Sequence, residues 1–243
     1  MRYFGNDYYS SYLSHHGIKG QKWGVRRTPE QLGHYKISDR GKLTPSEAKK
    51  CNELAKNVYN TAKDREPKIT EDILTTVSKT SSEMYGLEHK IKTQKSIAAK
   101  IGADAKEKDI SFEEASNKIK DAVRYTTITS ENDFVNNYNY IKSSLENDGY
   151  KETKCKNYFD LYEKGEVKHK SVTSTFADPK GYEFEIQFQT QASQRAKDLK
   201  TPIYTEARNS TTSESRRKEL ESEMSRLAEE VPYPKDYKTI RSH

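Results

Sequence analysis

Hydrophobic and polar residues follow two different periods along this chain. Over residues 182–190 they alternate strictly, with apolar side chains on one side and acidic and amide side chains on the other. This alternation predicts an amphipathic β-strand. Weaker patterns predict strands over residues 121–128, 150–158 and 167–176. Helices are expected between these strands, but strands and helices do not alternate one by one. We therefore predict an α+β fold in which helices flank a mixed β-sheet.

The predicted helices carry apolar residues three or four positions apart. The clearest of them places four apolar residues on one face, namely Phe134, Tyr138, Ile141 and Leu145. Further helices are expected over residues 44–65, 70–86, 191–199 and 213–230.

Proline is expected to divide the first two of these helices. The sequence Glu66-Pro67 follows the first helical pattern, and proline lacks the amide donor that a helix interior needs. We therefore place a domain boundary near residue 66. The predicted parts are a basic leader over residues 1–43, a helical linker over 44–65, a catalytic domain over 66–208, and a charged helix with a tail over 209–243.

The positive charge of the chain is concentrated before that boundary. Residues 1–65 contain 13 Lys and Arg against 6 Asp and Glu, a net charge of +7. The rest contains 30 against 31, a net charge of −1. Proteins that bind polyanions usually carry a basic face, so this distribution argues against nucleic-acid binding by the predicted domain. It leaves open whether the basic arm binds protein or nucleic acid.

Composition also limits the expected compartment. Only 32% of the residues are hydrophobic, and no apolar run approaches the ~18–20 residues that span a bilayer. We therefore expect no membrane partner. Cys51 and Cys155 are far apart and form no C-x-x-C pair, which argues against a disulfide scaffold or a zinc site and favours a reducing compartment.

One predicted helix carries groups that suit a phosphate chain. Thr93 stands at the expected N-cap, and the helix after it places Ser96 and Lys100 on one face, with Lys92 one turn earlier. Backbone donors, the helix dipole and lysines on one side favour a bound triphosphate. The ordinary alternative is a solvated lysine face.

Carboxylates occur in two later segments. Asp121 precedes Arg124 at the start of one predicted strand, and Glu185 and Gln187 lie on the polar face of the strand over 182–190. A magnesium-dependent phosphoryl or pyrophosphoryl transfer site needs such carboxylates beside cations. The ordinary alternatives are a surface aspartate that caps a strand and an edge strand with one wet face.

In order and spacing these segments resemble the synthetase domain of the RelA/SpoT alarmone synthetases. That family has an R-x-K-[ST]-x-x-S-[IL]-x-x-K stretch, then a D-x-x-G-x-R strand and an E-x-Q-I-R-T strand. The matching residues here are Lys92, Thr93, Ser96, Ile97, Lys100, Glu185, Gln187 and Thr190. The departures are Lys90 and Gln189, which replace arginines, and the segment from Asp121 to Arg124, which is two residues shorter and lacks the glycine.

The resemblance implies a nucleotidyltransferase-like fold that moves pyrophosphate from Mg-ATP to a ribose hydroxyl of a nucleotide or RNA acceptor. Asp121 and Glu185 would bind Mg²⁺, and Glu185 would take the hydroxyl proton. The implied ATP and phosphate ligands are Lys90, Lys92, Ser96, Lys100 and Arg124. The implied acceptor ligands are Lys156, His169 and Gln187, with His169 standing where the family has a tyrosine that stacks on guanine.

Residues 14–27 (SHHGIKGQKWGVRR) resemble the N-terminal leader of phage and prophage virion-associated proteins. Trp23 beside Lys22 and Arg26 suits a docking peptide, because an aromatic anchor with a cationic rim binds well in a groove. The resemblance implies phage capsid or scaffold proteins as partners. It also implies a location in the virion interior or the bacterial host cytoplasm. Delivery inside a virion would suit a toxic or host-remodelling effector.

Two other functions stay open. One is a non-enzymatic component of the phage head with a decayed transferase fold, favoured by the departures from the family pattern. The other is an ADP-ribosyltransferase toxin, since Arg124, the Thr-Ser-Thr run at 173–175 and the Glu-x-Glu at 183–185 resemble that family's elements in order. Its second and third elements lie on separated strands, whereas the short spacing here predicts adjacent strands of one hairpin.

Overall fold

The computed structural model describes residues 43–207 and 212–243. The helices are α2 (Pro45–Val77), α3 (Gln94–Lys108), α4 (Phe112–Asn117), α5 (Phe134–Asn147), α6 (Tyr158–Glu163), α7 (Gln191–Ala207) and α8 (Glu214–Glu229). The strands are β1 (Glu83–Tyr85), β2 (Arg124–Thr129), β3 (Lys151–Asn157), β4 (Val172–Ala177) and β5 (Glu183–Thr190). The leader, with its predicted docking peptide, lies outside the described residues.

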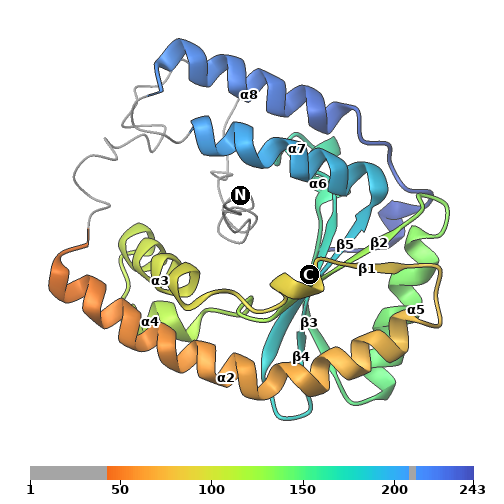
Figure 1. Cartoon of the computed structure of the whole chain (residues 1–243). Helices are drawn as coiled ribbons and strands as arrows, with labels where there is room; N and C mark the ends of the chain where they lie inside the picture. The colour runs from red at the N-terminus through yellow and green to blue at the C-terminus, as the bar shows by residue number, and fades with distance from the viewer. Residues whose placement is uncertain (1–42, 208–211) are drawn as a thin grey trace.

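The strands form one mixed sheet in the order β1-β2-β5-β4-β3 (Figure 1). Strands β2 and β5 are parallel, and the other pairs are antiparallel. Strand β5 is central, so that Glu185 lies opposite both Arg124 of β2 and Thr175 of β4. The predicted α+β fold with a mixed sheet is therefore confirmed. The edge-strand alternative for residues 182–190 is wrong, because β5 has a partner on each side.

The two faces of β5 meet different surroundings, as their alternation predicts. Phe184, Ile186 and Phe188 are buried, and the ring of Tyr138 from α5 packs edge-on against Phe188 with the centroids 5.0 Å apart. The opposite face carries the acidic and amide side chains, next to helix α7. Apolar burial on the first face holds the sheet against α5 and leaves the polar face for the site.

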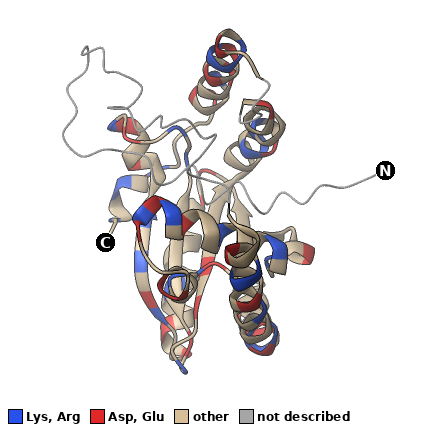
Figure 2. Ribbon diagram, turned by 90° about the vertical axis from the view of Figure 1, so that its left-hand side faces the viewer, with Lys and Arg blue, Asp and Glu red and all other residues tan. Residues whose placement is uncertain are grey.

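The helices lie on opposite sides of that polar face. Helices α2, α3 and α4 form one group, α7 and α8 form the other, and the sheet joins them (Figure 1). Figure 2 shows the same separation after a quarter turn, with α7 and α8 stacked together and away from the sheet's lower part. The two groups therefore bound the polar face from two directions.

Helix α2 corrects the predicted break at Pro67. It runs unbroken through this proline, and the predicted boundary near residue 66 therefore falls inside a helix. An interior proline costs about 3 kcal/mol. Burial on both sides of it offsets this cost, because Ala55 and Ala62 are buried before it and Ile69 and Ile73 after it. The division of the chain into four parts stays a prediction.

Several predicted boundaries also differ from the structure. The second helix ends at Val77 and not near residue 86, and β1 follows it after a turn. Strand β2 starts at Arg124, β4 starts at Val172, and α7 continues to Ala207. A strand of three residues such as β1 is too short to show an alternating pattern, and its pairing with β2 fixes it instead.

The chain after α8 covers the outer edge of β3. The amide of Cys155 donates to the carbonyl of His243 at 3.2 Å, and the amide of His243 donates back at 3.0 Å. The side-chain amide of Asn157 donates to the carbonyls of Tyr237 and Ile240 at 2.8 and 2.9 Å. These contacts satisfy backbone groups that an open sheet edge would leave unpaired. Among the described helices, none has the length and apolar character needed to cross a lipid bilayer.

We predict that Phe188→Ala lowers the free energy of unfolding by about 3–5 kcal/mol, because it opens a cavity against Tyr138. Tyr140→Ala is the matched control, since Tyr140 lies on the same helix as Tyr138 but is 42% exposed. Chemical denaturation followed by circular dichroism measures both. Equal losses for the two variants would contradict the described core.

Candidate active site

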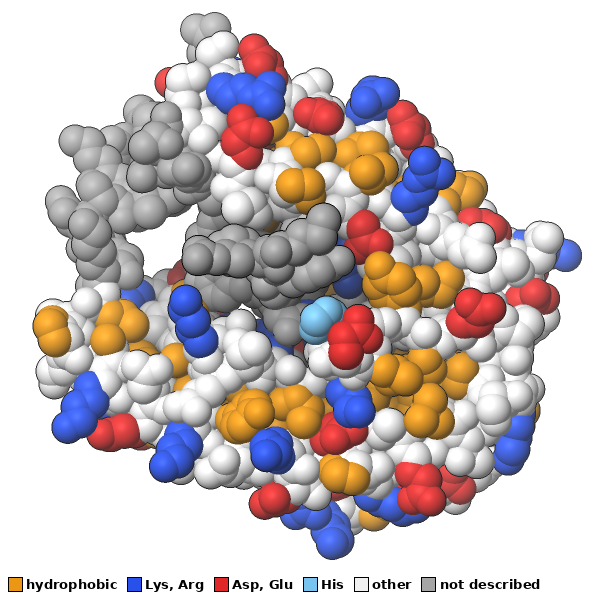
Figure 3. Space-filling model, viewed as in Figure 1, with side chains coloured by type: hydrophobic (Ala, Val, Ile, Leu, Met, Phe, Trp, Pro, Cys, Tyr) orange, Lys and Arg blue, Asp and Glu red, His pale blue; other side chains and the backbone are white. Residues whose placement is uncertain are grey.

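A pocket of about 620 Å³ lies over the polar face of the sheet. Ten lysines and one arginine line it, against six carboxylates. On the outer surface, by contrast, Lys and Arg alternate with Asp and Glu along α2 and α8 (Figure 3). The net charge of −1 over residues 66–243 therefore conceals a cationic pocket, and such a pocket favours a small polyanionic ligand.

Helix α3 begins as its sequence predicts. The amide of Ser96 donates to Thr93 Oγ1 at 3.1 Å, which caps the helix N-terminus. Ile97 and Ile101 are buried and fix the helix against its neighbours. The hydroxyl of Ser96 accepts from that of Thr93 at 2.9 Å. Ser96 does not line the pocket, so its predicted contact with ATP receives no support from this arrangement.

Asp121 lies between two lysines where the pocket meets the core. Its Oδ2 accepts from Lys92 Nζ at 2.7 Å and from Lys100 Nζ at 2.8 Å. Lys92 is only 1% exposed and Asp121 only 5%, so Asp121 is no surface cap. Burial alone would raise the pKa of Asp121, but the two ammonium groups outweigh it and hold this pKa well below its usual range.

Lys92 is not among the residues that line the pocket, so the phosphate-binding role that we expected for it receives no support from this arrangement. Its main chain donates to the carbonyl of Ala122 at 2.9 Å, next to a bridge between Ile91 and Val123. The side chain turns inward from there to Asp121. Lys100 does line the pocket. Burial lowers its pKa, but Asp121, with help from Glu185, raises it above the usual value.

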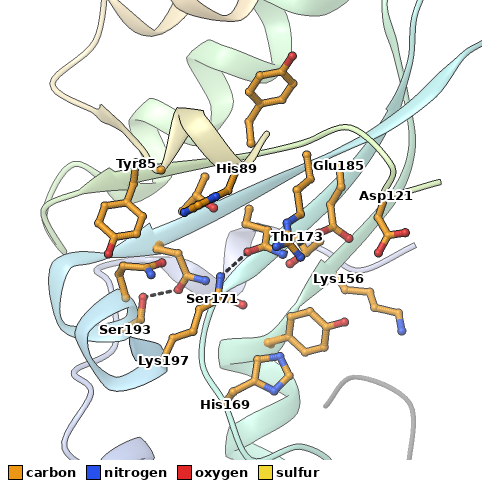
Figure 4. A pocket seen from close by; sticks show the side chains of 18 of the residues that line it. Tyr85, His89, Asp121, Lys156, His169, Ser171, Thr173, Glu185, Ser193 and Lys197 are labelled. Atoms are coloured by element: carbon orange, nitrogen blue, oxygen red, sulfur yellow. Dashed lines mark hydrogen bonds between the residues drawn. The ribbon is translucent and has the colours of Figure 1, made fainter. Parts of the chain in front are cut away.

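Two carboxylates in the pocket could share the coordination of a magnesium ion with the phosphates of a ligand. Asp121 Oδ1 is buried and has no hydrogen-bond partner among the described residues, and Figure 4 shows the carboxyl groups of Asp121 and Glu185 near each other. No group of three His, Cys, Asp or Glu suited to a metal occurs in the described part of the chain. Mg²⁺ commonly takes one or two carboxylates and completes its shell with phosphates and water, so this pair fits it.

A chain of hydrogen bonds orients Glu185. Lys197 Nζ donates to Gln187 Oε1 at 2.7 Å, and Gln187 Nε2 donates to Glu185 Oε1 at 2.6 Å (Figure 4). One turn along, Ser193 Oγ donates to Gln189 Oε1 at 2.6 Å. The amide side chains of β5 thus connect the carboxylate to helix α7, and within residues 43–207 and 212–243 the hydrogen bond from Gln187 uses one oxygen of Glu185.

Lys90 and Arg124 lie side by side in the wall of the pocket. The amide of Arg124 donates to the carbonyl of Lys90 at 2.8 Å, and both side chains line the pocket. Lys90 Nζ forms an ion pair with Glu66 at 3.2 Å. Lys90 thus has a carboxylate partner from α2. An arginine at this position would in addition offer a flat guanidinium surface for stacking.

Lys156 and His169 meet at the opposite end of the pocket. His169 packs on Tyr158 with ring centroids 4.2 Å apart, and Lys156 Nζ lies 5.9 Å from the centroid of Tyr158. Burial, and then the nearby lysines, lower the pKa of His169 to about 3. His169 is therefore neutral near pH 7, and its partly exposed ring packs at a tilt on the buried ring of Tyr158.

The structure brings together eight of the ten predicted site residues and leaves Lys92 and Ser96 out. It adds lysines that the sequence analysis missed, above all Lys197 and Lys200 of α7. Ser193, Lys197 and Lys200 follow one another at helical spacing directly after β5. That spacing is the signal by which a polar helix face over the strand's end was predictable.

Strands β4 and β5 form one hairpin, as the spacing predicts for residues 173–185. The Thr-Ser-Thr run and Glu185 thus lie on adjacent strands, and the separated arrangement of the ADP-ribosyltransferase elements is not found here. This topology counts against that alternative.

Comparison with known proteins gave limited similarity. A model of a family of unknown function (DUF7211) matches residues 6–30. No curated protein matches the chain. Among solved structures, the small alarmone synthetase 2 from Bacillus subtilis is similar, with 20% identity over 73% of this chain and 89% of that chain, and a TM-score of 0.48. The small alarmone synthetase 1 from Bacillus subtilis bound to its product pppGpp has 14% identity over 71% and 90%, with a TM-score of 0.45.

A GTP pyrophosphokinase family protein from Streptococcus pneumoniae has 12% identity over 77% of this chain and 89% of that chain, with a TM-score of 0.45. At these identities and scores the likeness carries no argument about chemistry.

We predict that Asp121→Asn lowers the free energy of unfolding by about 3–5 kcal/mol near pH 7, because two partly or fully buried ammonium groups lose their counter-ion. Adding Lys92→Met should restore much of this loss. Denaturant unfolding of both single variants and the double variant measures the coupling, and additive losses would contradict the buried pair.

The pH dependence of the same difference has a defined sign. The folded-state pKa of Asp121 is lowered, so its contribution is present above the unfolded pKa of about 4 and is lost as the pH falls further. The stability gap between wild type and Asp121→Asn should therefore close in acid.

Proposed function

We propose that this protein transfers pyrophosphate from Mg-ATP to a ribose hydroxyl of a nucleotide or RNA acceptor, as a RelA/SpoT-like enzyme. The observation that carries the proposal is the convergence of Asp121, Lys100 and Glu185 in one cationic pocket. Their sequence segments are far apart, yet the fold gathers the carboxylates and cation that this chemistry needs.

The donor end is assigned to the region between α3 and β2. Lys100, Lys90 and Arg124 supply positive charge for the phosphates of ATP, and Asp121 with Glu185 would hold Mg²⁺. The ion, when bound, neutralises charge that develops on the phosphate oxygens. Lys92 contributes by keeping Asp121 ionised and in place, without touching the ligand.

The proposed transfer would use these positions as follows. The acceptor hydroxyl oxygen forms a bond to the β-phosphorus of ATP, and the bond between that phosphorus and the oxygen bridging to the α-phosphate breaks, so that AMP leaves. The hydroxyl proton passes to Glu185, which Gln187 and Lys197 orient from β5 and α7. Alignment of the two substrates supplies most of the acceleration in such reactions.

The acceptor end is assigned to Lys156 and to His169, whose ring packs at a tilt on that of Tyr158. A base placed against His169 would share the pocket with Glu185, which Figure 4 shows beside Asp121. A neutral imidazole stacks without repelling the surrounding lysines.

The leader segment is assigned a separate role. We propose that residues 14–27 direct the protein to phage capsid or scaffold proteins, so that the transferase is carried as an effector. The support is the distinct composition of this segment, with the chain's single tryptophan beside several cations.

We predict that Glu185→Gln abolishes transfer and leaves the fold intact. The change removes the proton acceptor and one proposed metal ligand, while a half-exposed polar position costs under about 1 kcal/mol of stability. Release of AMP from labelled ATP in the presence of GDP, GTP, ADP or tRNA measures activity.

Glu183→Gln is the matched control, since Glu183 lies on the same face of β5, pairs with Lys120 at 2.6 Å and does not line the pocket. It should retain activity. Full activity of Glu185→Gln in an active preparation would overturn the proposed mechanism. Failure of the wild type to bind Mg-ATP at millimolar concentration would favour the non-enzymatic head component.

We predict that residues 1–30 fused to a reporter carry it into phage particles, as an address segment would. Purified particles are probed for the reporter, with a fusion carrying Trp23→Ala as the control for loss of the aromatic anchor. A reporter absent from particles that contain the full-length protein would contradict the assignment.

A further inference from the structure

The loop between α6 and β4 forms part of the pocket wall but contains no helix or strand. It spans residues 164–171, and its last three residues, His169, Lys170 and Ser171, line the pocket. Nδ1 of His169 has no hydrogen-bond partner among the described residues. The position of this ring therefore depends on its packing against Tyr158 and on the backbone of the loop.

Lys170 connects this loop to two other parts of the chain. The residue is only 6% exposed. Its ammonium lies 4.5 Å from the ring centroid of Tyr162 in α6 and 4.2 Å from that of Tyr233, which follows α8. It also donates to the carbonyl of Val231 at 2.6 Å. The two ring faces and the carbonyl together compensate part of the cost of burying the charge.

The segment after α8 is itself held in place, so it can serve as an anchor for Lys170. The rings of Tyr233 and Tyr237 stack with their centroids 5.0 Å apart, and Phe159 of α6 packs against both. Tyr237 Oη donates to Glu163 Oε2 at 3.0 Å. Val231 lines the pocket, so the anchored segment extends from the outer edge of β3 to the site.

A charged side chain at position 170 does more than fill space. A methionine would occupy the same interior without the cost of desolvating an ammonium group. The ammonium has to meet the carbonyl of Val231 and two ring faces at once, which restricts the placement of the loop backbone. Because His169 and Ser171 are the direct neighbours of Lys170 in the chain, the same restriction applies to both.

We propose that Lys170 is a positioning residue, which clamps loop 164–171 to the segment after α8 and thereby holds His169 in the pocket wall. This placement of His169 rests on the contacts of Lys170 alone. The consequence for catalysis rests on the proposed function, in which His169 contacts the acceptor. Release of the clamp should then weaken binding of the acceptor and leave binding of Mg-ATP unchanged.

A pH titration of the His169 ring by nuclear magnetic resonance, in the full chain, tests the clamp without requiring transfer. A His169→Asn variant assigns the signal. Burial, and then nearby lysines, lower the pKa of His169 to about 3, and a loosened loop would expose the ring. In Tyr233→Leu, which leaves every lysine in place, we expect the titration midpoint to rise by about one pH unit or more, toward the ordinary value of about 6.5.

Substitutions of the lysine itself complete the series. Lys170→Met should raise the His169 midpoint as Tyr233→Leu does. Lys170→Arg should raise it less, because a guanidinium group also stacks on aromatic rings and donates to a carbonyl. An unchanged His169 midpoint in both Tyr233→Leu and Lys170→Met would overturn the clamp.

Lys168→Met is the matched control. Lys168 lies in the same loop, is exposed and does not line the pocket. Its carbonyl accepts from Lys200 Nζ at 3.0 Å, a contact that the substitution leaves in place. His169 should titrate in this variant as in the wild type. A rise as large as that in Tyr233→Leu would contradict a specific role for Lys170.

Steady-state kinetics then separate the clamp from the proposed function. In an active preparation, Tyr233→Leu should raise the KM for the acceptor about tenfold and change the KM for Mg-ATP by less than about twofold, because binding is lost at one end of the pocket only. Equal rises in both KM values would contradict a local clamp. If the wild type transfers no pyrophosphate while the His169 midpoint moves as expected, the clamp stands and the proposed function fails.

Discussion

The contact of Asp121 with Lys92 and Lys100 connects the parts of this protein on which the site depends. Lys92 lies just before α3, Lys100 lies within α3, and Asp121 lies just before β2. One carboxylate oxygen thus joins α3 to the start of β2, while the other is buried without a hydrogen-bond partner among the described residues. Because Lys92 already balances Asp121, the charge of Lys100 remains available to a ligand.

The central position of β5 fixes the second carboxylate, that of Glu185, in the same way that the two lysines fix Asp121. Its apolar face is fixed by α5, and its polar face is fixed by hydrogen bonds that pass from Glu185 through Gln187 to Lys197. A side chain held on a paired strand loses little conformational freedom when a ligand binds, which favours precise positioning.

Much of this arrangement follows from local sequence patterns. The alternation in β5, the cap at Thr93 and the apolar face of α5 each predict an element that the structure contains. The continuity of α2 through Pro67 was not predictable in this way, because burial by distant elements outweighs a local penalty. The inward turn of Lys92 was missed for a related reason. Whether a lysine meets solvent or a buried carboxylate depends on a partner from another segment, which periodicity does not reveal.

The cationic pocket was likewise not predictable from the charge of the sequence. The net charge of residues 66–243 is −1, but acidic residues are spread over the surface while lysines from several elements meet inside.

The most direct test of the account is ³¹P nuclear magnetic resonance of the wild-type protein with Mg-ATP and each candidate acceptor. The account predicts AMP and a pyrophosphorylated acceptor in equal amounts. Transfer of a single phosphate with release of ADP, or AMP formed with free pyrophosphate and an unchanged acceptor, would contradict it.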